Sequence, residues 1–439
     1  MNEPPSDRSG FRALRQRRPL VVISIAVVAL TAAAMWLAFV LLRPTPPRTV
    51  AMATGPEGSV SADLGRRYRE LLAHDGIELQ LVPSAGAAEN AARLRDPHSG
   101  LSIAIVASGI TNRQESPGLV SLGTLFYEPL WIFYRGPRVQ EKHEGLQGKR
   151  IAVGPAGSGT RALSLEFLAR VGIIDQRSAT LLALTPQVAA EKLLQGEIDA
   201  AIMLSAWGSP VVQQLIAAEG VNLASTPRPD AFVALYPFLS KVVLPAGVGD
   251  MVNNRPPTDV VLLAPKASLV VRSDLHSAIQ YLLLEAAAQI HSGPGIFQKA
   301  GEFPAPESID LPLSEPARQF YKTGPPFLQR HLPFWLAVLV QQLLVVLIPV
   351  VGVLYPLLKS APAAYDWAMQ RRVFNLYSEL EVLEHELAAR SAQEGVGDLA
   401  ARLDRLEERA SRARLPVSFR AQLHTLRFHI TLVRQRLQR

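Results

Sequence analysis

The sequence has no cysteine among its 439 residues. This absence excludes disulfide frameworks, thiol nucleophiles and thiolate metal sites together. The nine histidines are dispersed without metal-ligand spacing, and neither a nucleophile elbow nor a pair of catalytic carboxylates can be found. We therefore expect a protein that is not an enzyme and that carries no metal or cofactor.

The middle of the chain has almost no net charge of either sign. Residues 48–331 carry 25 basic and 26 acidic side chains, so this large region is close to neutral. The excess of basic residues that gives the net charge of +7 lies at the two ends of the chain. Residues 1–47 carry six basic and two acidic side chains, and residues 332–439 carry 14 basic and ten acidic ones. A nucleic-acid-binding domain would gather its basic residues on a folded region, so this distribution argues against nucleic acid as a partner.

The first of two long uncharged runs covers residues 19–42 and predicts a transmembrane helix, since 24 residues of helix extend about 36 Å. Four arginines directly before it indicate, by the positive-inside rule, that residues 1–18 are cytoplasmic: Arg12, Arg15, Arg17 and Arg18. The alternative is a cleaved signal peptide with Ala51-Met52-Ala53 as its cleavage site, but the apolar run is longer than such peptides have.

The second uncharged run covers residues 332–358 and predicts another transmembrane helix, with Trp335 and Tyr355 near its ends as interfacial aromatics. The alternative is a buried core helix. Two spans anchor the protein in the cytoplasmic (inner) membrane of a bacterium or archaeon. They place residues 48–328 in the periplasm and residues 359–439 in the cytoplasm, so both termini are cytoplasmic.

The outer region alternates short apolar runs with helical patterns, which predicts an α/β fold with parallel sheets. Lobe one is expected to cover about residues 48–128 and 236–328, and lobe two about 136–226, with residues 123–136 crossing between them. The expected strands are 49–53, 77–82, 103–107, 149–153, 181–184, 198–204, 260–263 and 269–272, and the expected helices are 61–73, 85–95, 158–171, 186–195 and 275–290. Two lobes joined by crossing segments leave a cleft, where ligands of such proteins bind.

A glycine-rich turn, Gly154–Thr160, stands between a predicted strand and a predicted helix. Backbone N–H groups and the helix dipole favour an anion there, so Gly157, Ser158, Gly159 and Thr160 are candidate ligand-binding residues. A P-loop is excluded because Arg161 follows Thr160, and a dinucleotide site lacks its acidic residue after the next strand. A turn that only starts a helix remains an alternative.

A second turn, residues 54–59, follows the first strand of lobe one and adds Thr54 and Ser59 as candidates. Ser84 and Ser108 follow the next two strands and join the same group, although each could equally serve as a turn or cap residue. Glu128 and Trp131 in the crossing segment could line the cleft; the alternative places Trp131 in the core and Glu128 on the surface.

Several segments taken together resemble the TAXI-type solute-binding subunits of tripartite ATP-independent periplasmic (TRAP) transporters. They run in order from residue 49 to residue 290 and read ATGPEGS, VPSAGAAENAARL, LFYEPLWIFYR, LQGKRIAVGPAGSGT and GEIDAAIML. The resemblance implies a type II periplasmic-binding-protein fold that binds small organic anions, such as glutamate or dicarboxylates, and delivers them to a TRAP-type permease. It also implies binding roles for Ser59, Ser84, Ser108, Gly157, Ser158 and Thr160. The two spans indicate a membrane-anchored variant of this family.

The tail after the second span shows three helical patterns, at residues 365–392, around 399–406 and at 417–437. Self-association through a helical hairpin or coiled coil is one interpretation, and a stub packed near the membrane is the other. The tail also leaves open a second function, in which the binding domain acts as a sensor or assembly factor rather than as a transport receptor.

Overall fold

The computed structural model describes residues 46–136, 146–173, 179–389, 396–412 and 419–437, with a few single positions between 29 and 36. Two units are distinguished, one of residues Thr45–Leu339 and one that includes Val340–Arg439. The basic segment 1–18 and almost all of the predicted span 19–42 lie outside the described residues.

Lobe one is built on strands whose order in the sheet is β2-β1-β3-β11, with β4 also paired to β11. The first three strands are parallel, and β11 is antiparallel to both β3 and β4. Every residue of β3 is buried, as expected for the middle strand of a sheet covered on both faces. The bounds are β1 (Thr49–Ala53), β2 (Glu78–Val82), β3 (Ile103–Ala107), β4 (Leu119–Tyr127) and β11 (Val260–Arg272).

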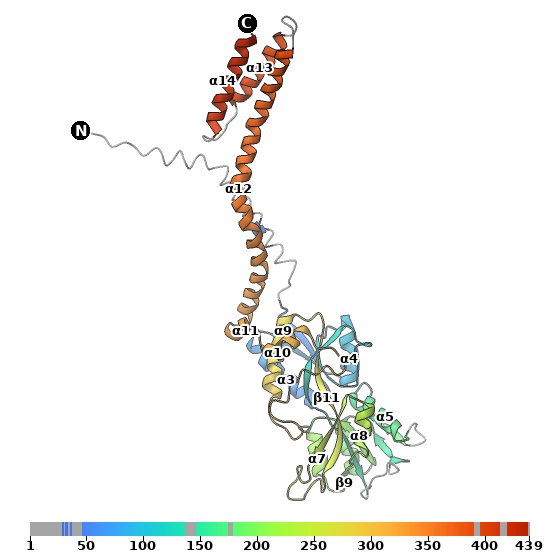
Figure 1. Cartoon of the computed structure of the whole chain (residues 1–439). Coiled ribbons are helices and arrows are strands. Elements are labelled where there is room, and N and C mark those ends of the chain that lie inside the picture. Colours follow the sequence, from blue (N-terminus) through green and yellow to red (C-terminus); the bar gives the residue numbers. More distant parts are fainter. Residues whose placement is uncertain are drawn as a thin grey trace, which may run out of the picture. The chain divides into compact units, whose positions relative to one another are not determined.

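Helices surround the sheet of lobe one (Figure 1). One core joins α3 and α9 to the inner strands, and it includes the fully buried side chains of Tyr68 and Leu283. A second core lies under α4, around Ala91 and Leu94. The helices of this lobe are α3 (Val60–His74), α4 (Ala87–Arg95), α9 (Ser277–His291) and α10 (Glu315–Thr323).

Lobe two is a five-stranded sheet with the order β7-β6-β8-β5-β9. Its strands β6, β7 and β8 are parallel, while β5 is antiparallel to both of its neighbours. The strands are β5 (Leu130–Arg135), β6 (Arg150–Ala152), β7 (Thr180–Leu182), β8 (Ala200–Leu204) and β9 (Val221–Leu223), and the helices are α5 (Gly159–Arg170), α6 (Pro186–Gln195), α7 (Pro210–Ala217) and α8 (Pro229–Leu235).

Two segments cross between the lobes. The first is the predicted one, because β4 belongs to lobe one and β5 to lobe two, with Glu128 and Pro129 between them. The second is β11, which is one strand of 13 residues where the sequence predicted two strands. Its first half pairs with β10 (Leu239–Leu244) as far as Pro265, and its second half pairs with β3 from Ala267. Pro265 therefore lies where the partner strand changes and a ladder N–H is not needed.

The packing of β10 and of the first half of β11 follows lobe two. Leu244 and Leu262 are buried in the same core as Trp131 and Phe133 of β5. Residues 239–264, which the sequence placed in lobe one, thus pack with lobe two, and the chain returns to lobe one within β11. Its β-branched and leucine side chains suit burial on both faces, which explains how one strand serves two cores.

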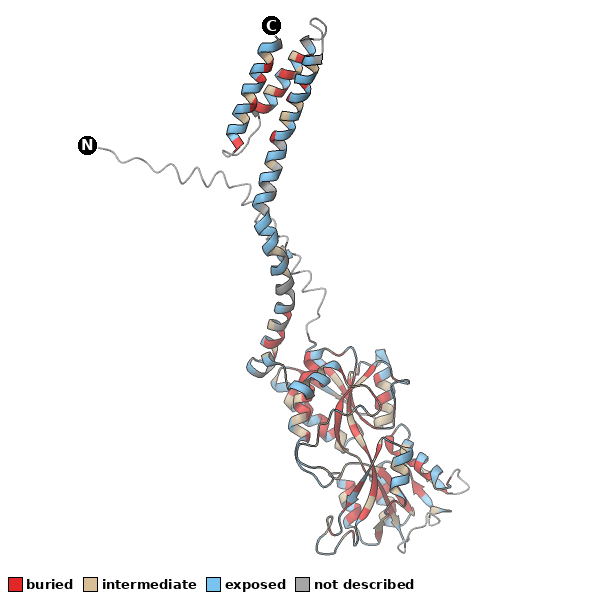
Figure 2. Cartoon of the chain, in the orientation of Figure 1, coloured by how far each residue is buried: buried red, intermediate tan, exposed pale blue. Residues whose placement is uncertain are grey.

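The second unit is helical and has its own small core. A helix of 56 residues, α12 (Phe334–Ala389), joins the predicted span and the first predicted tail helix into one element. Its last part packs with α13 (Val396–Arg412) and α14 (Arg420–Leu437) through buried leucines that include Leu383, Leu406 and Leu426. Figure 2 shows buried segments on all three helices.

A short helix, α11 (Phe327–His331), precedes α12. Among the helices in the described part of the chain, none has the combination of length and apolar character needed to span a bilayer.

Candidate functional site

A cavity of about 110 Å³ lies between the two lobes, at the ends of several strands. Residues that directly follow β1 and β8, namely Thr54 and Ser205, contribute to its wall. The beginnings of five helices also line it: Ser59 and Ser61 of α3, Gly86 and Ala87 of α4, Ser158–Thr160 of α5, Pro186 and Gln187 of α6, and Ser209 and Val211 of α7.

The convergence of five helix N-termini makes the wall of this cavity electropositive without a cationic side chain. The first N–H groups of each helix lack partners within the helix, and the helix dipole places partial positive charge at the same end. Among the residues that line the cavity, all of which the structure describes, none is a lysine or an arginine. Such a wall favours a carboxylate or another small anion, which backbone amides would hold.

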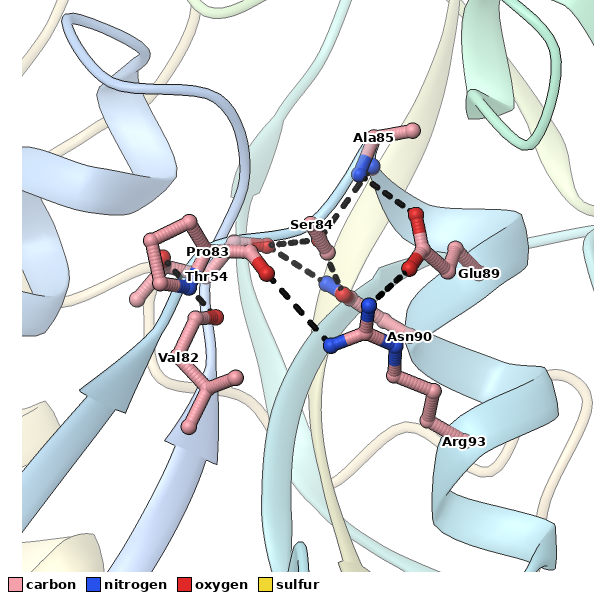
Figure 3. A network of polar contacts seen from close by, with 9 residues as sticks. Thr54, Val82, Pro83, Ser84, Ala85, Glu89, Asn90 and Arg93 are labelled. Atoms are coloured by element: carbon pink, nitrogen blue, oxygen red, sulfur yellow. Dashed lines mark hydrogen bonds and ion pairs between the residues drawn. The ribbon is translucent and has the colours of Figure 1, made fainter. Parts of the chain in front are cut away.

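In lobe one, a single buried side chain ties the strand ends together (Figure 3). The Asn90 amide nitrogen donates to the carbonyl oxygen of Thr54 at 2.7 Å and to that of Ile105 at 3.2 Å. The Asn90 amide oxygen accepts from the Ser84 hydroxyl at 2.5 Å. Asn90 thus connects the residues that follow β1 and β2 with the middle of β3, and it holds this wall of the cavity in one geometry.

The start of α4 is closed by Glu89, three residues after its N-cap Gly86. The carboxylate of Glu89 accepts from the backbone N–H of Ala85 at 2.7 Å and forms an ion pair with Arg93 one turn later. This bond corresponds to one half of a capping box, in which a glutamate near the helix start satisfies a backbone donor before it; Gly86 has no side chain to supply the other half. The turn that carries Ser84 is therefore fixed from both sides, as Figure 3 shows.

In lobe two, the glycine-rich turn is held by its own hydroxyl groups. Ser158 caps α5, because its hydroxyl oxygen accepts from the N–H of Arg161 at 3.1 Å and its hydroxyl donates to the carbonyl of Pro155 at 2.7 Å. The hydroxyl oxygen of Thr160 accepts from the N–H of Leu204 at 3.1 Å. This bond ties the first turn of α5 to the end of β8, and it leaves backbone amides rather than hydroxyls to face a ligand.

The two lobes touch at the glycine turns on this rim. The N–H of Glu89 in α4 donates to the carbonyl of Gly157 in lobe two at 2.9 Å. Gly86 has a φ of 133°, and a Cβ added to it would lie 3.4 Å from the Cα of Ser158. A Cβ added to Gly159 would lie 3.2 Å from the Cβ of Ala87. Glycine at these positions allows the two backbones to approach closely.

The eight predicted binding residues divide into two groups. Five of them line the cavity: Thr54, Ser59, Ser158, Gly159 and Thr160. The other three, Ser84, Ser108 and Gly157, do not line it. Ser84 bonds to Asn90, the Ser108 hydroxyl donates to the carbonyl of Lys266 at 2.9 Å, and Gly157 contacts the other lobe. These three residues therefore contact other parts of the protein rather than the cavity.

The hydroxyls of the residues that line the cavity also have structural roles. Ser59 is the N-cap of α3, and its oxygen accepts from the N–H of Ala62 at 3.2 Å. Thr54 donates weakly to backbone carbonyls, at 3.4 Å. Cap and binding roles coincide here because both require a polar residue at the start of a helix.

The crossing segment provides one ionisable side chain to the cavity. Glu128 lines it and is half-buried, and its burial raises the pKa of the carboxyl group to about 7. Among the described residues, none forms a hydrogen bond or an ion pair with this carboxyl group. Trp131 is fully buried in the core of lobe two, and its indole N–H donates to the carbonyl of Ser205 at 2.8 Å, as the core alternative predicts.

Sequence reasoning missed five polar residues of the site: Ser61, Asn90, Gln187, Ser205 and Ser209. Ser205 follows strand β8 as Ser84 and Ser108 follow theirs, so the same argument applies to it. Thr185 and Ser209 each stand before a proline at the first helical position, which is a signal for a helix start. No comparable signal marks Asn90, whose role depends on three strands lying next to one another.

Comparison with solved structures finds low similarity in sequence and in structure. A protein from Bordetella bronchiseptica RB50 is 14% identical with a TM-score of 0.40, over 56% of this chain and 72% of that one. The alkanesulfonate-binding protein SsuA from Xanthomonas axonopodis pv. citri is 16% identical with a TM-score of 0.35, over 56% and 74% of the two chains. An ancestral arginine-binding protein is 14% identical with a TM-score of 0.36, over 56% and 93%.

A family model provides the clearer match. The model of the NMT1-like family matches residues 52–323, well over half of the chain. This range contains every residue that lines the cavity, from Thr54 to Val211. On this evidence the chain belongs to the NMT1-like family.

Proposed function

We propose that this protein is a solute-binding receptor that holds a small organic anion in the cavity between its lobes, without catalysis. The observation that carries this proposal is the convergence of five helix N-termini on one cavity whose described lining contains no basic side chain. A carboxylate accepts several hydrogen bonds at once, so it can use backbone amides from more than one helix.

Lobe two supplies the more suitable donors for the carboxylate. The N-cap residues of α6 and α7, Thr185 and Ser209, make no capping hydrogen bond to their helices among the described residues. In contrast, Ser59 caps α3 and the carbonyl of Gly157 accepts from α4. The first residue of each helix is a proline without an N–H, but the N–H groups of the residues that follow it remain available for a ligand. We place the carboxylate against these N–H groups and the start of α5.

The finer assignment rests on the sequence motifs. We propose that the receptor is of the TAXI type and delivers its ligand to a TRAP-type permease, in keeping with the order of motifs from ATGPEGS to GEIDAAIML. A sensor is the second candidate, and one observation favours it. The helix α12 continues from the edge of the outer region into the helical core with α13 and α14.

The location of the protein is also a proposal. We propose that residues 19–42 and 332–358 anchor it in the cytoplasmic membrane, with the lobes in the periplasm. Support comes from the absence of charge in both runs and from exposed apolar side chains in the second, including Leu339, Leu343 and Val351.

Ligand binding by the full chain tests the receptor proposal. We expect at least one small carboxylate, among amino acids and mono- and dicarboxylates, to raise the melting temperature of the detergent-solubilised protein and to bind by calorimetry. The Gln187→Glu variant places a negative charge on the cavity wall and should weaken binding at least about tenfold.

Val188→Glu is the matched control for this test. It adds the same charge one residue further along α6, at an exposed position that does not line the cavity. Both substitutions place an acid in the first turn of a helix, where it is tolerated. The proposal is wrong if no carboxylate binds, or if both variants weaken binding equally.

A further inference from the structure

Among the described residues that line the cavity, Glu128 alone carries an ionisable group. It lies in the two-residue connection between β4 and β5, where the chain passes from one lobe to the other. Its backbone N–H donates to the carbonyl of Pro265 at 2.9 Å, so the backbone is held to the second crossing strand. The backbone of Glu128 is thus fixed between the two lobes, and the residue lines the cavity.

Acidic and basic groups near Glu128 already have partners elsewhere. Lys266 follows Pro265 on β11, and its ammonium group contacts both carboxylate oxygens of Glu307 at 2.6 and 2.8 Å. Tyr127, the residue before Glu128, donates its hydroxyl to Glu302 at 2.9 Å. Since desolvation is the sole cause of the raised pKa of Glu128, no described charged group offsets its burial.

This arrangement leaves the cavity with two polar requirements of opposite sign. The helix N-termini favour a negative group, whereas an ionised Glu128 favours a hydrogen-bond donor with a positive charge. A dicarboxylate would satisfy the helices, but it would bring a further negative charge into the same small cavity as Glu128. A ligand with one carboxylate and one ammonium group would satisfy both.

We propose that the ligand is a zwitterion, an amino acid in the chemical sense, whose carboxylate lies at the helix N-termini of lobe two and whose ammonium group lies against Glu128. This inference rests on the proposed receptor function and narrows its substrate class. Glu128 is then the residue that distinguishes amino acids from plain carboxylic acids.

Pairs of probes that differ only in the ammonium group test the inference with the full-length protein. Calorimetric titration compares L-glutamate with glutarate, L-alanine with propanoate, and L-norleucine with hexanoate at pH 8. We expect the amine-bearing member of at least one pair to bind at least about tenfold more tightly, since a charge-assisted hydrogen bond is worth about that factor or more.

Two charge-neutralising variants locate the effect. Glu128→Gln should reduce the preference for the amine to about threefold or less, because the amide keeps the shape but not the charge. Glu57→Gln is the matched control, since Glu57 is exposed in the neighbouring turn and does not line the cavity. This control should retain the full preference of the unmodified protein.

The pH dependence provides an independent readout. Binding of an ammonium group needs Glu128 ionised, so the affinity for an amino acid should rise as the pH increases from 6 to 8. Affinity for a dianion would fall over the same range.

The outcomes separate this inference from the function on which it rests. If the plain carboxylate of every pair binds as tightly as its amine-bearing partner, or affinity falls with rising pH, the zwitterion inference is wrong and the receptor proposal stands. If no member of any pair binds, both are wrong.

Discussion

The rims of the two lobes face one cavity but are held together differently. In lobe one, the side chain of Asn90 connects the residues after β1 and β2 with the middle of β3, and Glu89 accepts from the backbone N–H of Ala85 just before α4. In lobe two, Thr160 provides one bond between a helix and a strand, and α6 and α7, two of the three helices of this lobe that line the cavity, begin without a side-chain cap. The difference indicates that the polar groups on the rim of lobe one are bonded within the protein, whereas the rim of lobe two keeps backbone donors for a ligand.

The largest effect on stability should come from removing the hydrogen bonds that Asn90 makes in lobe one. Asn90→Ala leaves the carbonyls of Thr54 and Ile105 without their donor in a buried place, so we expect a loss of about 4 kcal/mol in the free energy of unfolding. Urea unfolding of the unit Thr45–Leu339 within the protein, followed by tryptophan fluorescence, measures this change.

Asn222→Ala is the matched control for this prediction. Its side-chain amide makes one bond to the carbonyl of Gly136 at an exposed edge of lobe two, at 2.9 Å, and should cost about 1 kcal/mol or less. Equal losses for the two variants would contradict the special role of Asn90.

The next effect concerns the crossing between the lobes. Burial raises the pKa of Glu128 to about 7, so the folded state retains a proton that the unfolded chain releases near pH 4.3. The stability that this group contributes is full below pH 4.3 and is lost as the pH rises through about 7. Relative to the unmodified protein, Glu128→Gln should therefore gain up to about 3 kcal/mol between pH 5 and pH 8.

The unfolding free energy of Glu128→Gln must be compared with that of the unmodified protein at each pH, because His291 changes stability with pH in the opposite direction. Burial lowers the pKa of His291 to about 4, so its contribution is present above pH 6.5 and lost as the pH falls toward 4. Urea unfolding at pH 5 and pH 8 gives the comparison, with Glu57→Gln as the variant that should show no trend. A pH-independent difference for Glu128→Gln would show that Glu128 is solvated.

The smallest effect should come from the rim of lobe two. Thr160→Val removes the acceptor of the Leu204 N–H without changing the shape of the side chain, and we expect a loss of about 1–2 kcal/mol. Thr160→Ser keeps the hydroxyl and should cost less than the valine variant. If Thr160→Val costs as much as Asn90→Ala, the contrast between the two rims fails.

Much of the fold follows from local patterns in the sequence. The strands β1 and β3 and the helix α6 match their predicted ranges, because each is an apolar or amphipathic run between turn residues. The length of β11 could not be predicted, since Pro265 and Lys266 interrupt the apolar pattern where the strand changes partners. Its neighbour β10 and the short strand β9 were not predicted at all.

The candidate site could be predicted as a place rather than as a set of contacts. Glycines and hydroxyl residues after strands indicate helix starts, so Thr54, Ser59, Ser158, Gly159 and Thr160 were found. What their side chains do depends on tertiary geometry: Ser158 caps its own helix, and Thr160 bonds to Leu204. The roles of Asn90 and Glu128 depend on segments far apart in the sequence, which no local pattern reports.

Hydrogen–deuterium exchange tests most directly whether the helix N-termini of lobe two hold the carboxylate. The full-length protein is compared with and without the tightest-binding carboxylate of the ligand screen. We predict slower exchange in the first turns of α6 and α7, around Gln187 and Val211, and little change at Ala62 and Glu89 in lobe one, whose amides already have partners. Protection confined to lobe one, or absent from both rims despite binding, would contradict the account.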